Sequence, residues 1–343
     1  MKFNEEKKQE IVIYMLEKIE QNCDALSKVV SQNFEVNQNT VHTYINELVD
    51  NNIIRRVKRG KYELVTNRYE FKFKRSKGDL EDDTYPYDVA LSEHIESLGE
   101  NIVSIWSYAF CEMVNNVIDH SNAENMKVIV EQNYLKTIAI LLDDGVGIFK
   151  KIKDHFGYRT LDEAITELFK GKLTTDSENH SGEGIFFSSK LMDDFYIVSS
   201  GKVFSNNKYD DSSLVNIEDG KLKGTAVFMS LSNFSHKKAK EVFDLYANVE
   251  GGFTKTQIPL SNIFDGSPVS RSQAKRVCSR LEEFKEVILD FAGISWMGQG
   301  FAHQMFVVFA KGHPEVNLVP INMNEDVKKM YVHVTYQKDT DQS

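Results

Sequence analysis

Three polar side chains recur every four residues in IWSYAFCEMVNNVIDHS, the otherwise apolar stretch at residues 105–121. Glu112, Asn116 and His120 share one stripe of an α-helix, because positions i, i+4 and i+8 lie above one another. A helix this apolar should be largely buried, and a buried carboxylate or amide costs several kcal/mol unless a partner satisfies it. Neighbouring groups of the fold usually supply that partner. The other source is a ligand.

Three later stretches carry glycines where a ligand could approach the backbone. LKTIAILLDDGVGIFKKI predicts a strand that ends in the loop 143–147, Asp-Asp-Gly-Val-Gly. HSGEGIFFSSKLMDDF places Gly182 and Gly184 at the start of a helix, and GTAVFMSLS predicts a strand opened by Gly224 and Thr225. Each stretch alone is a weak signal, because Gly-x-Gly occurs in many turns. Their order after the striped helix is the specific feature.

In this order the stretches resemble the ATP-binding domain of the GHKL superfamily, which gyrase, histidine kinases and MutL share. The resemblance covers residues 88–250 and implies an α/β sandwich, the Bergerat fold, that binds ATP and Mg²⁺. Asn116 would ligate Mg²⁺ through its amide oxygen. Glu112 would be the catalytic base that orients a water or hydroxyl toward the γ-phosphate. Asp143 would accept a hydrogen bond from the adenine amino group.

The glycine-bearing stretches would supply the remaining contacts of such a site. Gly145 and Gly147 would let the backbone pass close to the base and sugar. Gly182 and Gly184 would present N–H groups at a helix N-terminus to the phosphates, and Thr225 would lie behind the adenine. Residues 150–181 would form a lid over the nucleotide.

His120 narrows the resemblance within the superfamily. Glu112, Asn116 and His120 form the ExxxNxxxH pattern of the serine kinases that act as anti-sigma factors. A two-component sensor is rejected, because His94 in LSEHIESLG lacks the proline and the dimerisation helices expected of a histidine-kinase phosphoacceptor. For His120 itself, a nucleotide contact and a structural hydrogen bond within the fold both remain open.

The first 66 residues follow a different pattern. Apolar positions at helical period predict helices over residues 5–21, 25–34 and 39–52, the last with Asn39 or Thr40 as its N-cap. IIRRVKRGKYELV predicts two short strands that turn at Arg59-Gly60. Three helices and a hairpin resemble a winged helix-turn-helix domain, whose third helix enters the major groove of DNA.

A basic stripe favours DNA over protein as the partner of this domain. Residues 55–77 carry ten Lys or Arg against Glu63 and Glu70, on a chain whose formal net charge is −10. Local positive charge of this kind is what phosphate contacts require; a protein-docking domain with solvated charges is the alternative. The expected DNA-binding residues are Asn39, His42 and Thr43 of the third helix and Arg55, Arg56, Lys58, Arg59 and Lys61 of the hairpin.

The rest of the chain divides into a linker and a third domain. Residues 67–87 are charged and contain the first proline, so we expect a linker there. From 251 to 337, alternating strand and helix patterns predict a small α/β domain with a parallel or mixed sheet, ahead of a tail at 338–343.

This third pattern resembles the STAS-like domain of unknown function DUF4325, which is related to the anti-anti-sigma proteins that the serine kinases phosphorylate. Where those proteins carry the phosphorylated serine, Gly298-Gln299 stands here, and Ser295 lies three residues earlier. A glutamine cannot accept a phosphoryl group. A docking domain without chemistry is therefore the main alternative for this region.

Composition sets the broad class of the protein. With 343 residues, 41% of them hydrophobic and 27% charged, the chain fits several globular domains, and no apolar run is long enough to span a bilayer. Three scattered cysteines and an N-terminus unlike a signal peptide favour the cytoplasm.

We expect a multidomain α/β and α+β regulator in which Mg-ATP controls DNA binding. A homodimer fits this reading, since helix-turn-helix proteins usually read two half-sites, and the second or third domain could bind a protein partner. A protein serine kinase and a regulator that holds ATP without hydrolysing it are the two alternatives.

Overall fold

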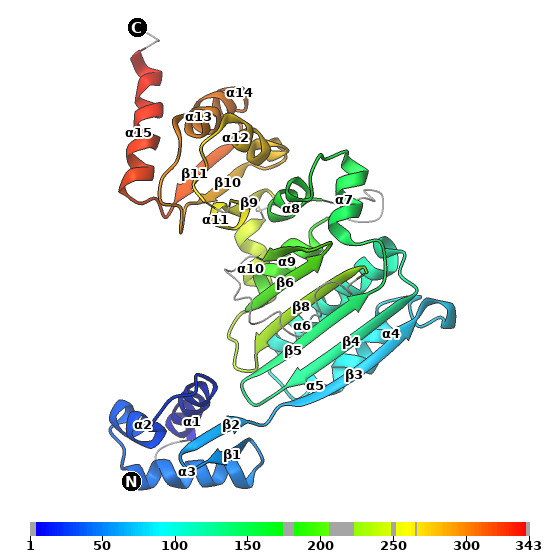
Figure 1. Cartoon of the computed structure of the whole chain (residues 1–343), viewed down its shortest axis with the longest axis vertical. Helices are drawn as coiled ribbons and strands as arrows, with labels where there is room; N and C mark the ends of the chain where they lie inside the picture. The colour runs from blue at the N-terminus through cyan, green and yellow to red at the C-terminus, as the bar shows by residue number, and fades with distance from the viewer. Residues whose placement is uncertain (1–4, 174–181, 206–222, 248–251, 265, 341–343) are drawn as a thin grey trace.

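The computed structural model describes residues 5–173, 182–205, 223–247, 252–264 and 266–340. It is a mixed α/β structure in which three units follow one another along the chain (Figure 1). Each unit has its own cluster of buried apolar side chains. No helix in these ranges is both long and apolar enough to cross a membrane.

The N-terminal unit has three helices and one antiparallel hairpin, as the sequence predicts: α1 (Glu5–Glu20), α2 (Leu26–Phe34), α3 (Gln38–Asp50), β1 (Ile54–Lys58) and β2 (Lys61–Leu64). Gly60 turns the hairpin with φ +73°, a conformation that glycine adopts without strain. The predicted N-cap of α3 is wrong. Asn37 caps the helix by accepting a hydrogen bond from the Asn39 N–H at 2.8 Å, so the helix begins before Asn39 and Thr40.

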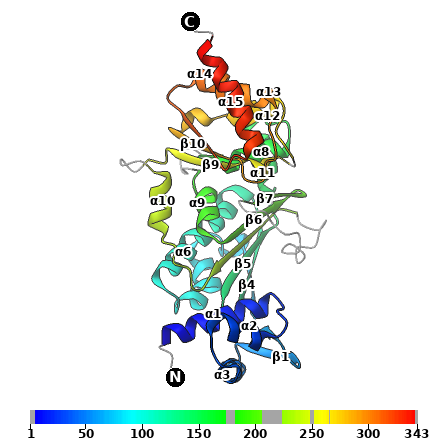
Figure 2. The same ribbon diagram turned by 90° about the vertical axis from the view of Figure 1, so that its left-hand side faces the viewer.

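The central unit is built on a six-stranded sheet in which every neighbouring pair is antiparallel. In sheet order the strands are β3 (Asn67–Lys74), β4 (Asn125–Gln132), β5 (Lys136–Asp143), β8 (Thr225–Ser232), β6 (Asp194–Ser199) and β7 (Lys202–Ser205). Helices lie on one face of this sheet, which Figure 2 shows edge-on. The core between the helices and the sheet contains fully buried large side chains such as Trp106, Phe110 and Phe195.

The helices of this unit are mostly short. They are α4 (Thr84–Tyr87), η2 (Asp88–Ser92), α5 (Glu93–Ile95), α6 (Glu100–Asn115), η3 (Asn116–Ser121), α7 (Ile148–Phe156), α8 (Leu161–Lys170), α9 (Gly184–Leu191) and α10 (Ala239–Tyr246). The segments η2 and η3 are π-helical turns that continue the α-helices before them.

The predicted linker at 67–87 is wrong. Residues 67–74 form β3, which pairs with β4 over its whole length, and the following short helix η1 (Arg75–Lys77) leads into α4. Leu80 and Pro86 are buried. The stretch looks like a linker because only one face of this edge strand is covered, so its other face carries charged residues.

The C-terminal unit has a three-stranded parallel sheet in the order β11 (Asn317–Ile321), β10 (Glu286–Asp290) and β9 (Lys255–Pro259). Its helices are α11 (Leu260–Ile263), α12 (Arg271–Cys278), η5 (Leu281–Glu283), α13 (Gln299–His303), η6 (Gln304–Phe309), α14 (Ala310–Gly312) and α15 (Glu325–Thr340). A capping box of Ser270 and Gln273 begins α12. The alternating α/β domain predicted from the sequence is therefore present, and its sheet is parallel throughout.

Side chains from one unit complete the core of the next. Phe186 and Phe187 of α9 belong to the C-terminal cluster and contact the rings of Tyr246 and Phe253. At the other end of the central unit, Leu135 is buried in the N-terminal cluster. The central sheet thus connects the N-terminal unit, at the bottom of Figure 1, to the C-terminal unit at its top.

Candidate functional site

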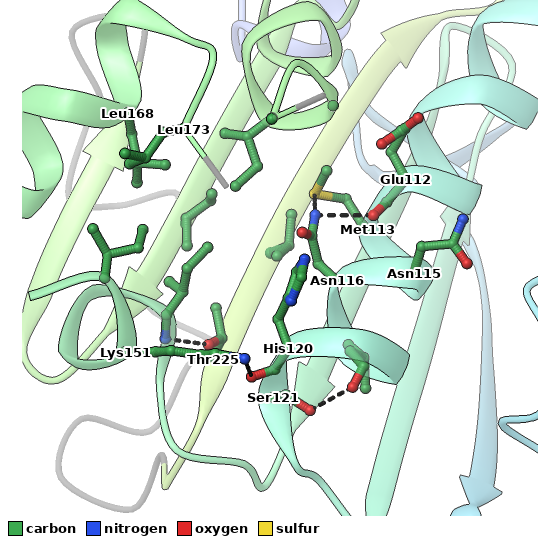
Figure 3. Close-up of a pocket in the computed structure, with 18 of the residues that line it drawn as sticks. Glu112, Met113, Asn115, Asn116, His120, Ser121, Lys151, Leu168, Leu173 and Thr225 are labelled. Atoms are coloured by element: carbon green, nitrogen blue, oxygen red, sulfur yellow. Dashed lines mark hydrogen bonds between the residues drawn. The ribbon is translucent and has the colours of Figure 1, made fainter. Parts of the chain in front are cut away.

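A cavity of about 280 Å³ opens between the striped helix, the end of β5 and the start of α9. This is close to the lower end of the roughly 300–1,000 Å³ typical of small-molecule sites. Apolar side chains from α6, α7, α8, α9, β6 and β8 form part of its wall, and several polar groups converge on it. Glu112, Asn116 and His120 all line it, so the stripe predicted from the sequence faces a cavity (Figure 3).

The backbone of the striped helix changes at Asn116. The α-helix ends at Asn115 and continues as the π-helical turn η3, a feature frequent at functional sites. Four residues of an α-helix turn through slightly more than a full circle, so side chains four residues apart drift around the helix. A π turn is wider and opposes this drift. Glu112, Asn116 and His120 all line the cavity across this change of backbone. The neighbouring Asn115 also lines the cavity, and its amide donates a hydrogen bond to Asp83 at 2.9 Å.

Asn116 is held by its own helix. Its amide nitrogen donates to the Glu112 carbonyl at 2.9 Å and lies 3.9 Å from the Met113 sulfur. The amide oxygen is consequently the group that Asn116 can offer to a ligand.

Asp143 lies at the opposite wall, at the end of β5, and is only 8% exposed. Its Oδ1 accepts a hydrogen bond from the Gly145 N–H at 2.8 Å. Burial raises the pKa of this carboxyl, while hydrogen bonds from Gly145 and Thr225 act in the opposite direction without cancelling the effect. A buried carboxyl with spare acceptor capacity is suited to receive a donor from a ligand.

The predicted glycines occur where the backbone makes close contacts. Gly147, with φ +84°, lines the cavity, and a side chain there would meet Ser199 Oγ at 2.7 Å. Gly182 and Gly184 also line it; a Cβ on Gly184 would overlap the Glu112 carboxylate. Gly145 is the one predicted residue that packs beside the cavity, against the Ser121 carbonyl.

Thr225 joins two of these segments. It lines the cavity, and its hydroxyl accepts a hydrogen bond from the Ile148 N–H at 3.1 Å, which ties the start of α7 to β8. Apart from Gly145, all the residues predicted for this site line the same cavity. These eight residues come from four separate parts of the chain.

Two cationic residues near this cavity were missed from the sequence. Lys151 of α7 lines it and donates to the His120 carbonyl at 2.7 Å. Arg75 donates to the carbonyls of Val117, Ile118 and Ala123 at 2.8–3.1 Å, so it holds the carbonyl end of the π turn. Lys151 stands between Ile148 and Ile152, two residues whose side chains turn inward, and that spacing was the available signal.

The predicted lid at 150–181 is partly helical. It contains most of α7 and all of α8, and Leu168, Gly171 and Leu173 line the cavity. Residues 174–181 lie outside the described part of the chain.

The rim at Gly171–Leu173 is tied to the C-terminal unit. Thr256 donates to the Lys170 carbonyl at 2.8 Å, and Arg280 donates to the Lys172 carbonyl at 2.6 Å. Lys172 in turn donates to the Glu283 carbonyl at 2.9 Å. One edge of the cavity is thus positioned by hydrogen bonds from a different unit.

A second group of predicted residues lies on the N-terminal unit. Asn39, His42 and Thr43 are exposed along α3, and Arg55, Arg56, Lys58 and Arg59 are exposed on the hairpin. Lys61 differs from the others, because it pairs with Asp24 at 2.5 Å and donates to the Asn22 carbonyl. Asn46 on the same helix was missed; its Oδ1 accepts a hydrogen bond from Arg56 at 2.6 Å and so links α3 to the hairpin.

Comparison with known families identifies part of the third unit. Residues 273–328 match the family described as STAS-like domain of unknown function (DUF4325). The matched segment runs from α12 through β10 and β11 to the start of α15, so the C-terminal unit is STAS-like as predicted. No curated protein matches the chain.

Proposed function

We propose that the protein is a GHKL-type regulator that binds ATP with Mg²⁺ in the central cavity and DNA through an N-terminal winged helix. The observation that carries the nucleotide site is the convergence of Asn116, Asp143 and the Gly182–Gly184 turn on one cavity. Asp143 would receive the adenine amino group at one end. The N–H groups at the start of α9 would receive phosphates at the other.

The donor set fits a magnesium ion that arrives with its nucleotide. Among the residues described, no group of three or more His, Cys, Asp or Glu side chains could hold a metal ion alone. Mg²⁺ commonly keeps several waters and takes phosphate oxygens as ligands, so one amide oxygen from Asn116 is a sufficient protein contribution. Lys151, beside His120, would add positive charge near the ribose or phosphates.

Isothermal titration with Mg-ATP tests the nucleotide site. Asn116→Ala and Asp143→Ala should each lower the affinity at least about 100-fold, since each removes a polar contact that a desolvated site leaves unreplaced. Asn51→Ala is the matched control: its amide likewise donates to the carbonyl four residues earlier, at 2.8 Å, but it lies in the N-terminal unit and does not line the cavity. Unchanged affinity in folded Asn116→Ala and Asp143→Ala proteins would exclude the GHKL assignment.

The DNA proposal is supported by which side chains are exposed. Asn39, His42 and Thr43 share the outer face of α3, the helix that would read base edges. Arg56, Lys58 and Arg59 project from the adjoining hairpin, where phosphate contacts would supply affinity without sequence information.

Replacing Arg56, Lys58 and Arg59 together by Ala should weaken binding to all duplexes about equally. The log-log salt dependence should flatten by up to roughly 0.9 per lost phosphate contact. Changes at Asn39, His42 or Thr43 should instead alter which sequence is preferred. Absence of binding by wild type to any duplex at low salt would reassign this unit to protein docking and leave the ATP proposal untouched.

A further inference from the structure

Three lysines stand together at the far end of β3, outside the predicted recognition elements. Lys72, Lys74 and Lys77 are all exposed. With Lys127 and Lys223 they line a second cavity, of about 570 Å³, on the face of the sheet opposite the helices. Asp143 and Asp144 form part of its wall, so this cavity lies directly behind the adenine end of the first one.

The charges on this face are unevenly paired. Nearer the hairpin, Arg68 pairs with Glu70 and Glu131, and Lys127 pairs with Glu70 at 2.8 Å. Within the described residues, the side chains of Lys72, Lys74 and Lys77 make no ion pair or hydrogen bond. The end of β3 therefore carries surplus positive charge that attracts an anion.

The carboxylates in the second cavity are already occupied by backbone groups. Asp79 accepts a hydrogen bond from the Lys74 N–H at 2.8 Å. Asp144 accepts hydrogen bonds from the N–H groups of Glu124 and Asn125 at 3.0 and 2.9 Å. These two carboxylates are thus fixed by the fold and are not paired with the lysines.

The hairpin and these lysines lie on the same side of the molecule. Figure 1 shows β2 running into β3, with the open face of the sheet in front of the helices, and Figure 2 shows β1 projecting toward that side. Lys72 lies thirteen residues after Arg59 in the chain. Even a fully extended chain would span at most roughly 45 Å, the length of about 13 base pairs.

We propose that DNA bound by the hairpin continues along β3 and that Lys72, Lys74 and Lys77 contact its phosphates. This inference rests on the proposed DNA binding by the N-terminal unit. A duplex is the partner favoured by the geometry, because the hairpin and the end of β3 present two separate basic clusters on the same side of the molecule, and a rigid rod can touch both. DNA in this position would lie against the back of the loop that carries Asp143 and Asp144.

Fluorescence anisotropy on the full chain can separate the two clusters. The hairpin variant replaces Arg56, Lys58 and Arg59 by Ala, and the sheet variant replaces Lys72, Lys74 and Lys77 by Ala. A control with the same charge change replaces the exposed Lys311, Lys328 and Lys329 of the C-terminal unit by Ala. Each protein is titrated with random duplexes of about 10 and about 30 base pairs over a range of KCl, and thermal melting verifies folding.

The sheet variant should bind the short duplex like wild type and the long duplex at least about tenfold more weakly, with a salt slope lower by about 2 to 3. The hairpin variant should lose affinity for both duplexes, and the control for neither. Wild-type affinity of the sheet variant for the long duplex, with loss in the hairpin variant, would overturn the inference and leave DNA binding intact. Absence of any duplex binding by wild type would overturn both.

Discussion

At the scale of single residues, the polar side chains at the two ends of the cavity differ in what they cost the stability of the fold. Asn116 is held in place by hydrogen bonds within its own helix, so its presence costs little. Asp143 is buried, and its burial opposes ionisation. Such a cost is expected at a binding site, where a group is kept for its ligand and not for stability.

The pH dependence of stability should reveal this cost. A carboxyl with a raised pKa contributes stability that is fully present below its ordinary pKa of 3.8 and is lost as pH rises through the raised value. Asp143→Asn removes that titration. In urea unfolding without nucleotide, wild type should therefore lose free energy of unfolding relative to Asp143→Asn as pH rises above 3.8 toward neutrality. A difference that stays flat over this range would contradict the raised pKa.

Substitution of Glu112 can distinguish between the alternative functions. Its carboxylate lies against Gly184, at the end of the cavity where the phosphates would bind. If it only orients the attacking oxygen, Glu112→Ala should keep Mg-ATP affinity within a few-fold while phosphate release falls about 100-fold or more. Equal turnover in this variant would exclude Glu112 as the base. Wild-type protein that releases no phosphate favours an ATP-holding regulator, and transfer to an added protein favours a serine kinase.

At the scale of elements, regular patterns could be predicted and departures from them could not. The four-residue polar spacing in an apolar helix indicated the stripe, because side-chain direction on a helix follows from sequence position alone. The π turn at Asn116–Ser121 has no such signal, since Arg75 supports it from 42 residues or more away in the chain. Lys151 was missed for a different reason: three lysines crowd α7, and its position between Ile148 and Ile152 was the one signal that distinguished it from the other two.

In the edge strand β3, the sequence carried a regular pattern that the prediction did not use. Tyr69, Phe71 and Phe73 alternate with polar residues, which is the period of a half-buried strand. Their neighbours Lys72 and Lys74 gave the stretch the composition of a linker. Lysines on an exposed edge strand also discourage pairing with another chain. Alternation was thus a better guide to structure here than charge content.

At the scale of the whole molecule, the cavity and the STAS-like unit share a boundary. Lys170, at the end of α8, is fully buried and donates to Glu167 at 2.6 Å and to the carbonyls of Arg276 and Ser279. Arg280 pairs with the same Glu167 at 3.2 Å. Two cations from different units therefore depend on one buried carboxylate, beside the rim at Gly171–Leu173 that lines the cavity.

This arrangement predicts that Glu167→Gln weakens both the contact between the units and the proposed nucleotide site. Removing one partner of a buried ion pair strands the other charge, at a cost of about 3–5 kcal/mol. Burial already lowers the pKa of Lys170, so an uncompensated ammonium there is especially unfavourable. Urea unfolding should show the loss, and titration should show weaker Mg-ATP binding because the rim loses its support.

A double variant distinguishes stranded charge from simple loss of contacts. Glu167→Gln combined with Lys170→Met removes the buried ammonium and keeps an apolar chain of similar length, so it should recover a large part of the lost stability. Asp244→Asn, which removes an exposed ion pair with Lys240, should change stability little. If the double variant is as unstable as the sum of its single changes, the buried charge is not the cause. The STAS-like unit would then be docked chiefly by the aromatic contacts of Phe186 and Phe187 with Phe253.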